Sequence, residues 1–168
     1  AGQSGTTGAA NGQGAAASFN QPSGVGVDQN GNVYVTDPQN HLIRKVTPQG
    51  LVSTFAGQTG TTGDANGPGT AASFNFPRGL TVDQSGNIYV ADTNNNLIRR
   101  ITSQGLVSTF AGQSGTSGDV NGQATTASFN SPRGVAVDQS GNVYVADRSN
   151  HLIRKISVGS TPATATSA

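Results

Sequence analysis

The sequence predicts an all-β fold built from three copies of one four-stranded antiparallel unit. The chain repeats with a period of 55 residues: Ala1, Ala56 and Ala111 each open the motif AGQ[ST]GT[TS]G, and the first two copies agree at 38 of 55 positions. Self-similarity at a fixed period is the signature of a repeat architecture. Within each copy, short stretches rich in Val, Ile and Tyr alternate with Gly-containing turns, a pattern typical of strands and unfavourable for helices.

The first two strands of each unit form a predicted hairpin. In the third copy they read GVAVD over residues 134–138 and NVYVAD over residues 142–147, with the alternation that a strand requires. Gly141 lies between them, and Gly31 and Gly86 hold the same place in the other copies. Glycine supplies the positive φ that a tight hairpin turn needs, so we expect this hairpin in all three copies.

Two further strands complete the unit. The third is predicted over residues 42–46, 97–101 and 152–156, and a Gln-Gly turn leads to a fourth over residues 51–55 and 106–110. Four such antiparallel strands form one blade of a β-propeller. The third copy departs after Ile156, where a stretch rich in Ser, Thr, Pro and Ala replaces LVSTF. We expect residues 157–168 to form a degenerate outer strand, weak or absent, or a flexible tail.

These strands resemble the NHL repeat family. The family takes its name from an Asn-His-Leu motif, present here as Asn40-His41-Leu42 and Asn150-His151-Leu152 but replaced by Asn95-Asn96-Leu97 in the middle copy. The resemblance covers nearly the whole chain, with blades over residues 1–55, 56–110 and 111–156. It implies a propeller that usually has six blades, of which this chain supplies three.

Three blades are expected to need a partner. Half a ring exposes the apolar side of a blade at each end, and exposed apolar patches usually mark an interaction surface. A homodimer of two head-to-tail chains closes a six-bladed ring and covers both ends. The alternative is a piece cut from a longer chain whose remaining blades complete the ring.

The charge balance argues against strongly charged partners. Charged residues make up 10% of the chain, the formal net charge is +1, and every acid is Asp. We therefore expect neither nucleic acid nor a membrane as a partner. The Tyr residues also fall at alternating core positions of the strands rather than on a basic rim, so no platform for stacking RNA bases is predicted.

The sequence leaves the cellular compartment open. The tail rich in Ser, Thr, Pro and Ala resembles the linkers between modules of secreted or cell-surface bacterial proteins, which favours such a location. Because the chain has no Met, we expect a processed, excised or engineered piece.

Arg78 and Arg133 are the candidate ligand-binding residues. Each lies in a Pro-Arg-Gly motif before the first strand of its blade, with Ser23 at this position in the first copy. They are expected near the channel mouth, where a dimer would gather four Arg side chains. Guanidinium groups there would bind a small anionic ligand such as a carboxylate, phosphate or sulfate, with pairing to a nearby Asp or simple solvation as the alternative.

One Asp–Arg pair recurs in every blade. The acid ends the second strand and the Arg lies seven residues later on the third, close across the hairpin; the pairs are Asp37 with Arg44, Asp92 with Arg99, and Asp147 with Arg154. An identical pair in each blade favours a structural salt bridge, because catalysis needs an asymmetric set of groups. His41 and His151 are expected to cap or hydrogen-bond the adjacent turn.

Each blade also begins with a loop of about 20 residues, such as residues 57–75. We expect this loop to have a structural role, with ligand binding as the alternative. Its Ala71, Ala72 and Phe74 are expected to tuck between blades. Asp64 and Asp119 superficially resemble the start of a calcium loop but lack its further acids, so we predict an Asx turn and no metal.

The function expected from these features is a non-catalytic, self-assembling propeller that acts as a scaffold for binding a protein or small ligand, without a cofactor. The alternative is an enzyme with a site in the channel, because the resemblance also extends to propeller lactonases and an amidating lyase that use metals. The chain has two His and neither Glu nor Cys, which is a poor set for a metal centre or a catalytic triad.

Overall fold

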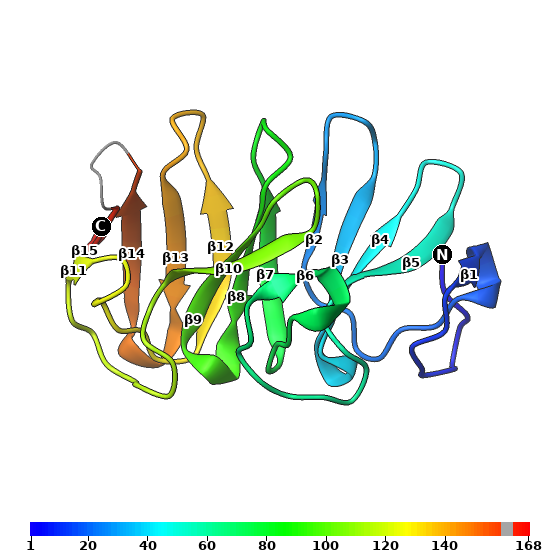
Figure 1. The fold of residues 1–168 in the computed structure, drawn as a ribbon, viewed down its shortest axis with the longest axis horizontal. Helices are drawn as coiled ribbons and strands as arrows, with labels where there is room; N and C mark the ends of the chain where they lie inside the picture. Colours follow the sequence, from blue (N-terminus) through cyan, green and yellow to red (C-terminus); the bar gives the residue numbers. More distant parts are fainter. Residues whose placement is uncertain (159–162) are drawn as a thin grey trace.

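The computed structural model describes residues 1–158 and 163–168, and its three antiparallel sheets lie side by side in chain order (Figure 1). The N-terminus lies at one end of the row and the C-terminus at the other. The sheets are the blades of a propeller-like, all-β fold, as the sequence predicts.

Each blade contains the four predicted strands together with a short fifth one. The first blade has the strand order β1-β5-β4-β3-β2 and comprises β1 (Gly12–Gln13), β2 (Val25–Val27), β3 (Val33–Asp37), β4 (Leu42–Val46) and β5 (Leu51–Ala56). The second blade comprises β6 (Gly67–Pro68), β7 (Pro77–Val82), β8 (Ile88–Asp92), β9 (Leu97–Ile101) and β10 (Leu106–Ala111). The third blade comprises β11 (Gly122–Gln123), β12 (Pro132–Val137), β13 (Val143–Asp147), β14 (Leu152–Ser157) and β15 (Thr164–Ser167).

The fifth strand comes from the long loop, and sequence analysis missed it. In the first blade, Gly12 pairs with Val52 and Gln13 with Leu51, so β1 covers the outer edge of β5. A two-residue strand carries no alternation of apolar and polar side chains that could reveal it in the sequence. Its effect is to pair a strand edge that would otherwise be open.

The outer strand of the third blade forms despite its divergent sequence. β15 pairs with β14, with Ile156 opposite Ala165, and also with β11. The expectation that this strand is weak or absent is therefore wrong for Thr164–Ser167, because backbone hydrogen bonds make the ladder and small residues such as Ala165 suffice for its buried positions. Residues 159–162 of the expected tail lie outside the described residues.

The helical segments are short. Within residues 1–158 and 163–168 they are three-residue 3-10 turns: η1 (Gly14–Ala16), η2 (Pro38–Asn40), η3 (Gly69–Ala71), η4 (Thr93–Asn95) and η5 (Arg148–Asn150). No helix in this part of the chain has the length or apolar character to cross a membrane.

The core consists of two similar layers, one between each pair of neighbouring blades. Between the first and second blades, Tyr34 and Ile43 belong to the same buried cluster as Phe74, Ile88 and Val90. The equivalent side chains form the second layer, in which Tyr89 and Ile98 cluster with Phe129, Val143 and Val145. The second blade therefore packs one face against the first blade and the other against the third.

The long loop contributes to this core, with one difference from expectation. Ala72 and Phe74 are fully buried, but Ala71 is exposed at the end of η3. Alternate residues of an extended segment point to opposite sides, so Ala72 and Phe74 face the layer together whereas Ala71 turns to solvent.

The inner strands β2, β7 and β12 approach one another at glycines. A Cβ atom added to Gly24 would overlap the carbonyl oxygen of Arg78, and one added to Gly79 would overlap that of Arg133. Backbone cannot move aside as the end of a flexible side chain can, so only glycine fits at these two positions. Each contact brings the start of one inner strand against the start of the next.

Neighbouring blades are also joined by a side chain of the Asn-His-Leu turn. His41 has a left-handed backbone, with φ of 60°, and its Nδ1 accepts a hydrogen bond from the Phe76 backbone N–H in the next blade at 3.3 Å. In the middle copy, Asn96 Oδ1 accepts the equivalent bond from the Ser131 N–H at 2.9 Å. His41 caps its own turn as expected, because its backbone N–H donates to the Pro38 carbonyl oxygen at 3.1 Å, and His151 does the same with Arg148 at 3.2 Å. The His41 side chain in addition bridges two blades, and Asn can replace it because both side chains offer an acceptor.

This bridge predicts a pH effect on stability. Burial lowers the pKa of His41 below its usual 6.5, so the unfolded chain binds more protons than the folded one just below that pH. The His41 contribution is then complete above pH 6.5 and declines on acidification toward the lowered pKa. His41→Asn, which copies the middle blade, should keep the stability at neutral pH and lose less of it than the parent chain near pH 5. Denaturant unfolding at the two pH values measures both differences; an equal acid loss in the two proteins would contradict the assignment.

Candidate functional site

The three Asp–Arg pairs predicted from sequence form buried ion pairs. Nη1 of the Arg lies 3.0 Å from Oδ2 of Asp37 in the first pair, 2.9 Å from that of Asp92 in the second and 3.1 Å from that of Asp147 in the third. All six side chains are fully buried. Burial of opposite charges is costly, and hydrogen bonds to their remaining donors and acceptors offset that cost.

Those donors and acceptors fasten the long loop to the blade. Besides Asp92, the Arg99 guanidinium donates to the carbonyl oxygens of Ser73 and Ala65 and to Asn66 Oδ1, at 2.8–3.1 Å. The guanidinium also lies over the Phe74 ring, 5.3 Å from its centroid. The same four contacts recur around Arg44 and Arg154. The pair therefore acts as a structural clamp on the loop.

The carboxylate side of the clamp is equally occupied. Asp92 Oδ1 accepts the Asn75 backbone N–H at 2.7 Å, and Oδ2 accepts Asn95 Nδ2 at 2.8 Å as well as Arg99. Burial raises the pKa of Asp92 to about 6, opposed by the Asn75 hydrogen bond and the Arg99 charge. The group is thus an ionised, fully engaged carboxylate at neutral pH. Nothing about its surroundings leaves it open to a substrate.

No metal-binding cluster occurs among the described residues: no three His, Cys, Asp or Glu side chains lie together. In the sequence that superficially resembles a calcium loop, the Asn66 side chain accepts a hydrogen bond from Arg99. Asp64 of the same sequence is exposed.

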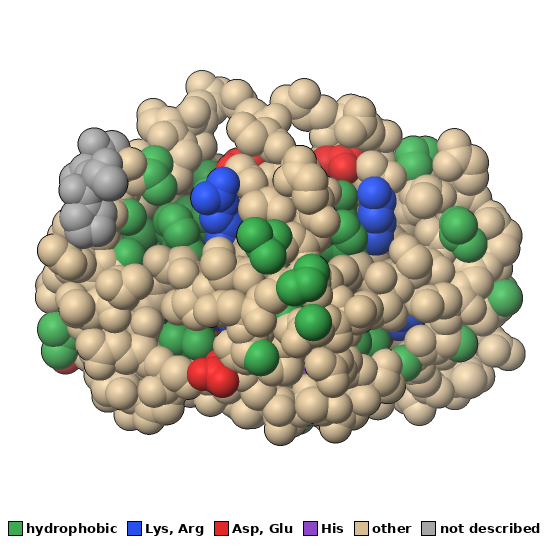
Figure 2. Space-filling model, viewed as in Figure 1, with side chains coloured by type: hydrophobic (Ala, Val, Ile, Leu, Met, Phe, Trp, Pro, Cys, Tyr) green, Lys and Arg blue, Asp and Glu red, His purple; other side chains and the backbone are tan. Residues whose placement is uncertain are grey.

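Arg78 and Arg133 lie at the starts of adjacent inner strands, β7 and β12. The approach of Gly79 to the Arg133 carbonyl oxygen places these two strand ends side by side. Arg133 is exposed and Arg78 half-buried. The structure thus places the starts of these two strands, each with its Arg, next to each other. On the face drawn in Figure 2, the Lys and Arg side chains are few and well separated.

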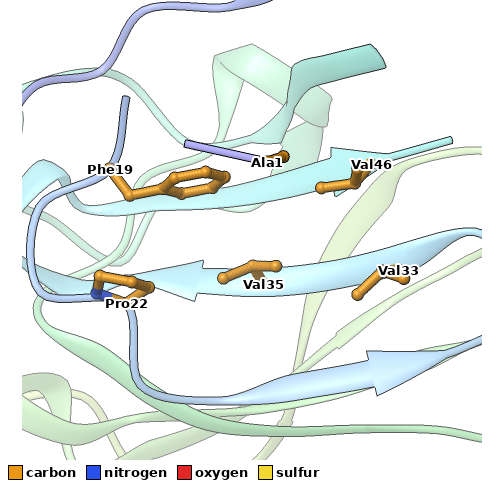
Figure 3. A pocket seen from close by; sticks show the side chains of 6 residues that line it. All are labelled: Ala1, Phe19, Pro22, Val33, Val35 and Val46. Carbon is orange, nitrogen blue, oxygen red and sulfur yellow. The ribbon is translucent and has the colours of Figure 1, made fainter. Parts of the chain in front are cut away.

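The first blade presents an apolar end face. A hollow there is lined by Ala1, Phe19, Pro22, Val33, Val35 and Val46, and Figure 3 shows these side chains gathered over β3 and β4. In the second and third blades, the residues equivalent to Phe19, Val33, Val35 and Val46 are all fully buried against the preceding blade. Val25 and Val27 of β2 are 65% and 57% exposed at the same end.

The third blade presents the opposite face. Ile153 is 55% exposed, whereas the equivalent Ile43 and Ile98 are fully buried beneath the following blade. Tyr144 is half-buried although Tyr34 and Tyr89 are 3% and 5% exposed. The two ends of the row therefore carry the two halves of an interface that the molecule already makes twice internally.

The clamp predicts a large stability loss when one partner is removed. Asp92→Ala leaves the Arg99 guanidinium buried without its anion, and we expect unfolding free energy to fall by about 3–5 kcal/mol. Asp64→Ala, an exposed Asp in the loop, is the matched control and should change it by less than about 0.5 kcal/mol. Chemical denaturation measures both variants; similar values for the two would rule out the clamp.

Comparison with known proteins places these blades among related folds. NHL repeat-containing protein 2 of Gallus gallus is 31% identical over 151 residues, which cover 82% of this chain and 21% of that protein. An auxiliary nutrient binding protein of Bacteroides thetaiotaomicron has 28% identity and a TM-score of 0.70 over 78% of this chain and 36% of its own. Virginiamycin B lyase of Staphylococcus aureus, at 17% identity and a TM-score of 0.59, shares the fold over 87% of this chain and 40% of its own.

This chain therefore spans less than half the length of each of these proteins. One structural neighbour is a binding protein and another an enzyme, so the shared fold does not by itself assign a function. The model of the NHL repeat matches residues 19–46, 74–101 and 129–156, which together make half of the chain. Each matched segment spans the three inner long strands of one sheet, and the chain belongs to the NHL repeat family.

Proposed function

We propose that this chain is a non-catalytic, self-assembling half-propeller, in which a second copy closes a six-bladed ring that serves as a binding scaffold. The observation that carries the proposal is the exposure of Ile153 and the partial exposure of Phe19, Val33, Val35 and Val46, at positions that are fully buried in the two internal interfaces. Burying an apolar side chain of this size contributes about 1.5–3 kcal/mol, so both ends favour a partner of matching shape.

A second copy has that shape because the internal interfaces serve as its template. The face of the first blade is equivalent to the faces of the second and third blades that cover Ile43 and Ile98. Placed head to tail, it would cover Ile153 and Tyr144 of the other copy in the same way. Two such contacts, related by a two-fold axis along the channel, leave no blade face uncovered.

Polar groups at the two ends match in the same register. His41 and Asn96 each accept a backbone N–H from the residue 35 positions later in the chain. If this spacing continues around the closed ring, His151 would accept a hydrogen bond from the backbone N–H of Gln21 of the second copy. Gln21 already has the left-handed backbone of its equivalents, with φ of 58° compared with 53° at Phe76 and Ser131.

A binding role is also consistent with how the chain uses its reactive side chains. Three of its eight acidic residues are engaged in the structural clamps, and the clamp is repeated rather than specialised in one blade. The nutrient-binding neighbour provides a precedent for binding on this fold. The lyase neighbour provides one for catalysis, but no group of residues described above favours that alternative.

The test uses Gly134, the third member of the inner-strand glycine series. Continued around the ring, a Cβ on Gly134 would overlap the Ser23 carbonyl oxygen of a second copy, as the other two glycines do within the chain. Inside one chain, that Cβ meets only the Ala146 Cβ, at 3.4 Å, and Gly134 does not need a left-handed backbone. Gly134→Ala should therefore fold but fail to pair.

Light scattering on a sizing column should give about twice the 16.8 kDa chain mass for the parent protein and the single-chain mass for Gly134→Ala. Circular dichroism and thermal unfolding should show that the variant remains folded. Gly79→Ala, which places the same overlap inside the chain, should instead fail to fold. Ile153→Asp offers an independent way to block pairing.

A parent protein that is monomeric at every concentration and cooperatively folded would overturn the proposal. Pairing that survives both Gly134→Ala and Ile153→Asp would also overturn it, because it would have to use other surfaces.

A further inference from the structure

A third arginine, Arg148, lies at the same end of the blades as Arg78 and Arg133. Arg148 is the first residue of η5 and follows Asp147, which pairs with Pro132 at the start of β12. Arg133 directly follows Pro132 and Arg148 directly follows Asp147, so the two arginines are neighbours of the same cross-strand pair. With Arg78 on the adjacent strand β7, three guanidinium groups belong to one end of the second and third blades. Sequence analysis missed Arg148, because its position in the other copies holds Pro38 and Thr93.

These three charges have no acidic partner within the described part of the chain. Every ion pair found there uses Asp37, Asp92 or Asp147 with an arginine of the clamps. The Asp residues of the inner hairpins, Asp28, Asp83 and Asp138, follow the opposite ends of β2, β7 and β12. The inner strands of the second and third blades thus begin beside arginines, and all three inner strands end beside an Asp.

The arginines are close enough to affect one another. Partial desolvation, together with the charges of Arg78 and Arg148, lowers the pKa of Arg133. Guanidinium remains protonated at neutral pH even so. The cluster therefore holds like charges together without a counter-charge from the described residues, and an anion placed among them would relieve the repulsion.

We propose that Arg78, Arg133 and Arg148 form an oxyanion-binding site for a small molecule that carries a phosphate or sulfate group. Guanidinium donates paired hydrogen bonds that match the oxygens of such groups. A doubly charged tetrahedral anion offers an oxygen to each of three neighbouring arginines, whereas a single carboxylate offers two oxygens and one charge. This site lies within one chain and does not depend on ring closure.

Titration calorimetry at constant ionic strength, with inorganic phosphate, sulfate and acetate as probes, tests the site. Phosphate or sulfate should bind saturably and more tightly than acetate. Arg133→Ser should weaken the binding by about tenfold or more, since a hydrogen bond to a charged group contributes about 1.5–3 kcal/mol. Serine is the residue that the first blade carries at this position, as Ser23, so the variant should fold.

Lys155→Gln is the matched control. It removes one positive charge as well, but Lys155 Nζ lies 5.8 Å from the centre of the Tyr144 ring, whose hydroxyl hydrogen-bonds to Asp138 at the acidic end. Phosphate affinity should be unchanged in this variant. Equal weakening in both variants would show general charge attraction and overturn the site, as would acetate binding as tight as phosphate or no saturable binding.

Light scattering on the same samples separates this proposal from ring closure. Arg133→Ser should keep the molar mass of the parent chain. Loss of phosphate binding with an unchanged molar mass assigns the effect to the rim, whereas a change in mass without a change in affinity would contradict the role given to Arg133.

Discussion

The fold depends on one buried interaction repeated three times, the Asp–Arg clamp. It lies where the second strand of a blade ends and the long loop passes, and its hydrogen bonds hold loop backbone that no regular strand would satisfy. Buried charges are costly, and removing one member would leave the other stranded. Hydrogen bonds offset much of this cost. In the first blade the carboxylate accepts from Asn and backbone donors, and the two terminal nitrogens of the guanidinium donate to two carbonyls, an Asn and the Asp.

The clamp also explains how so lean a core can hold together. Apolar residues are only 33% of the chain, and the layers between blades are thin. Because the loop is fixed, Phe74 and Phe129 are held against the preceding blade, where each fills the layer. The same arrangement leaves Phe19 over a face with no blade before it. The uncovered face of the first blade is thus a consequence of how each blade is built.

The features that repeat in each blade could be predicted from the sequence, whereas those that depend on contacts between distant residues could not. The period, the four main strands and the Asp–Arg partners follow from local patterns, because each is encoded within one hairpin. The bridge from His41 to Phe76 joins residues in different blades, and no pattern in the Asn-His-Leu turn specifies its partner. β15 has few apolar residues to signal a strand, and it forms because β14 and β11 offer backbone groups on both sides.

Differences between the copies carry a separate kind of information. The side chains that form the clamp are the same in all three blades, including Asn11, Asn66 and Asn121 on the loop. The rim positions are not: Ser23 stands in place of Arg78 and Arg133, and Arg148 has no basic equivalent. Since the blades share one backbone design, a substitution confined to some of them is not required by the fold. The framework therefore resides in what the copies share, and recognition is best sought where they differ, at a rim whose charge rises from the first blade to the third.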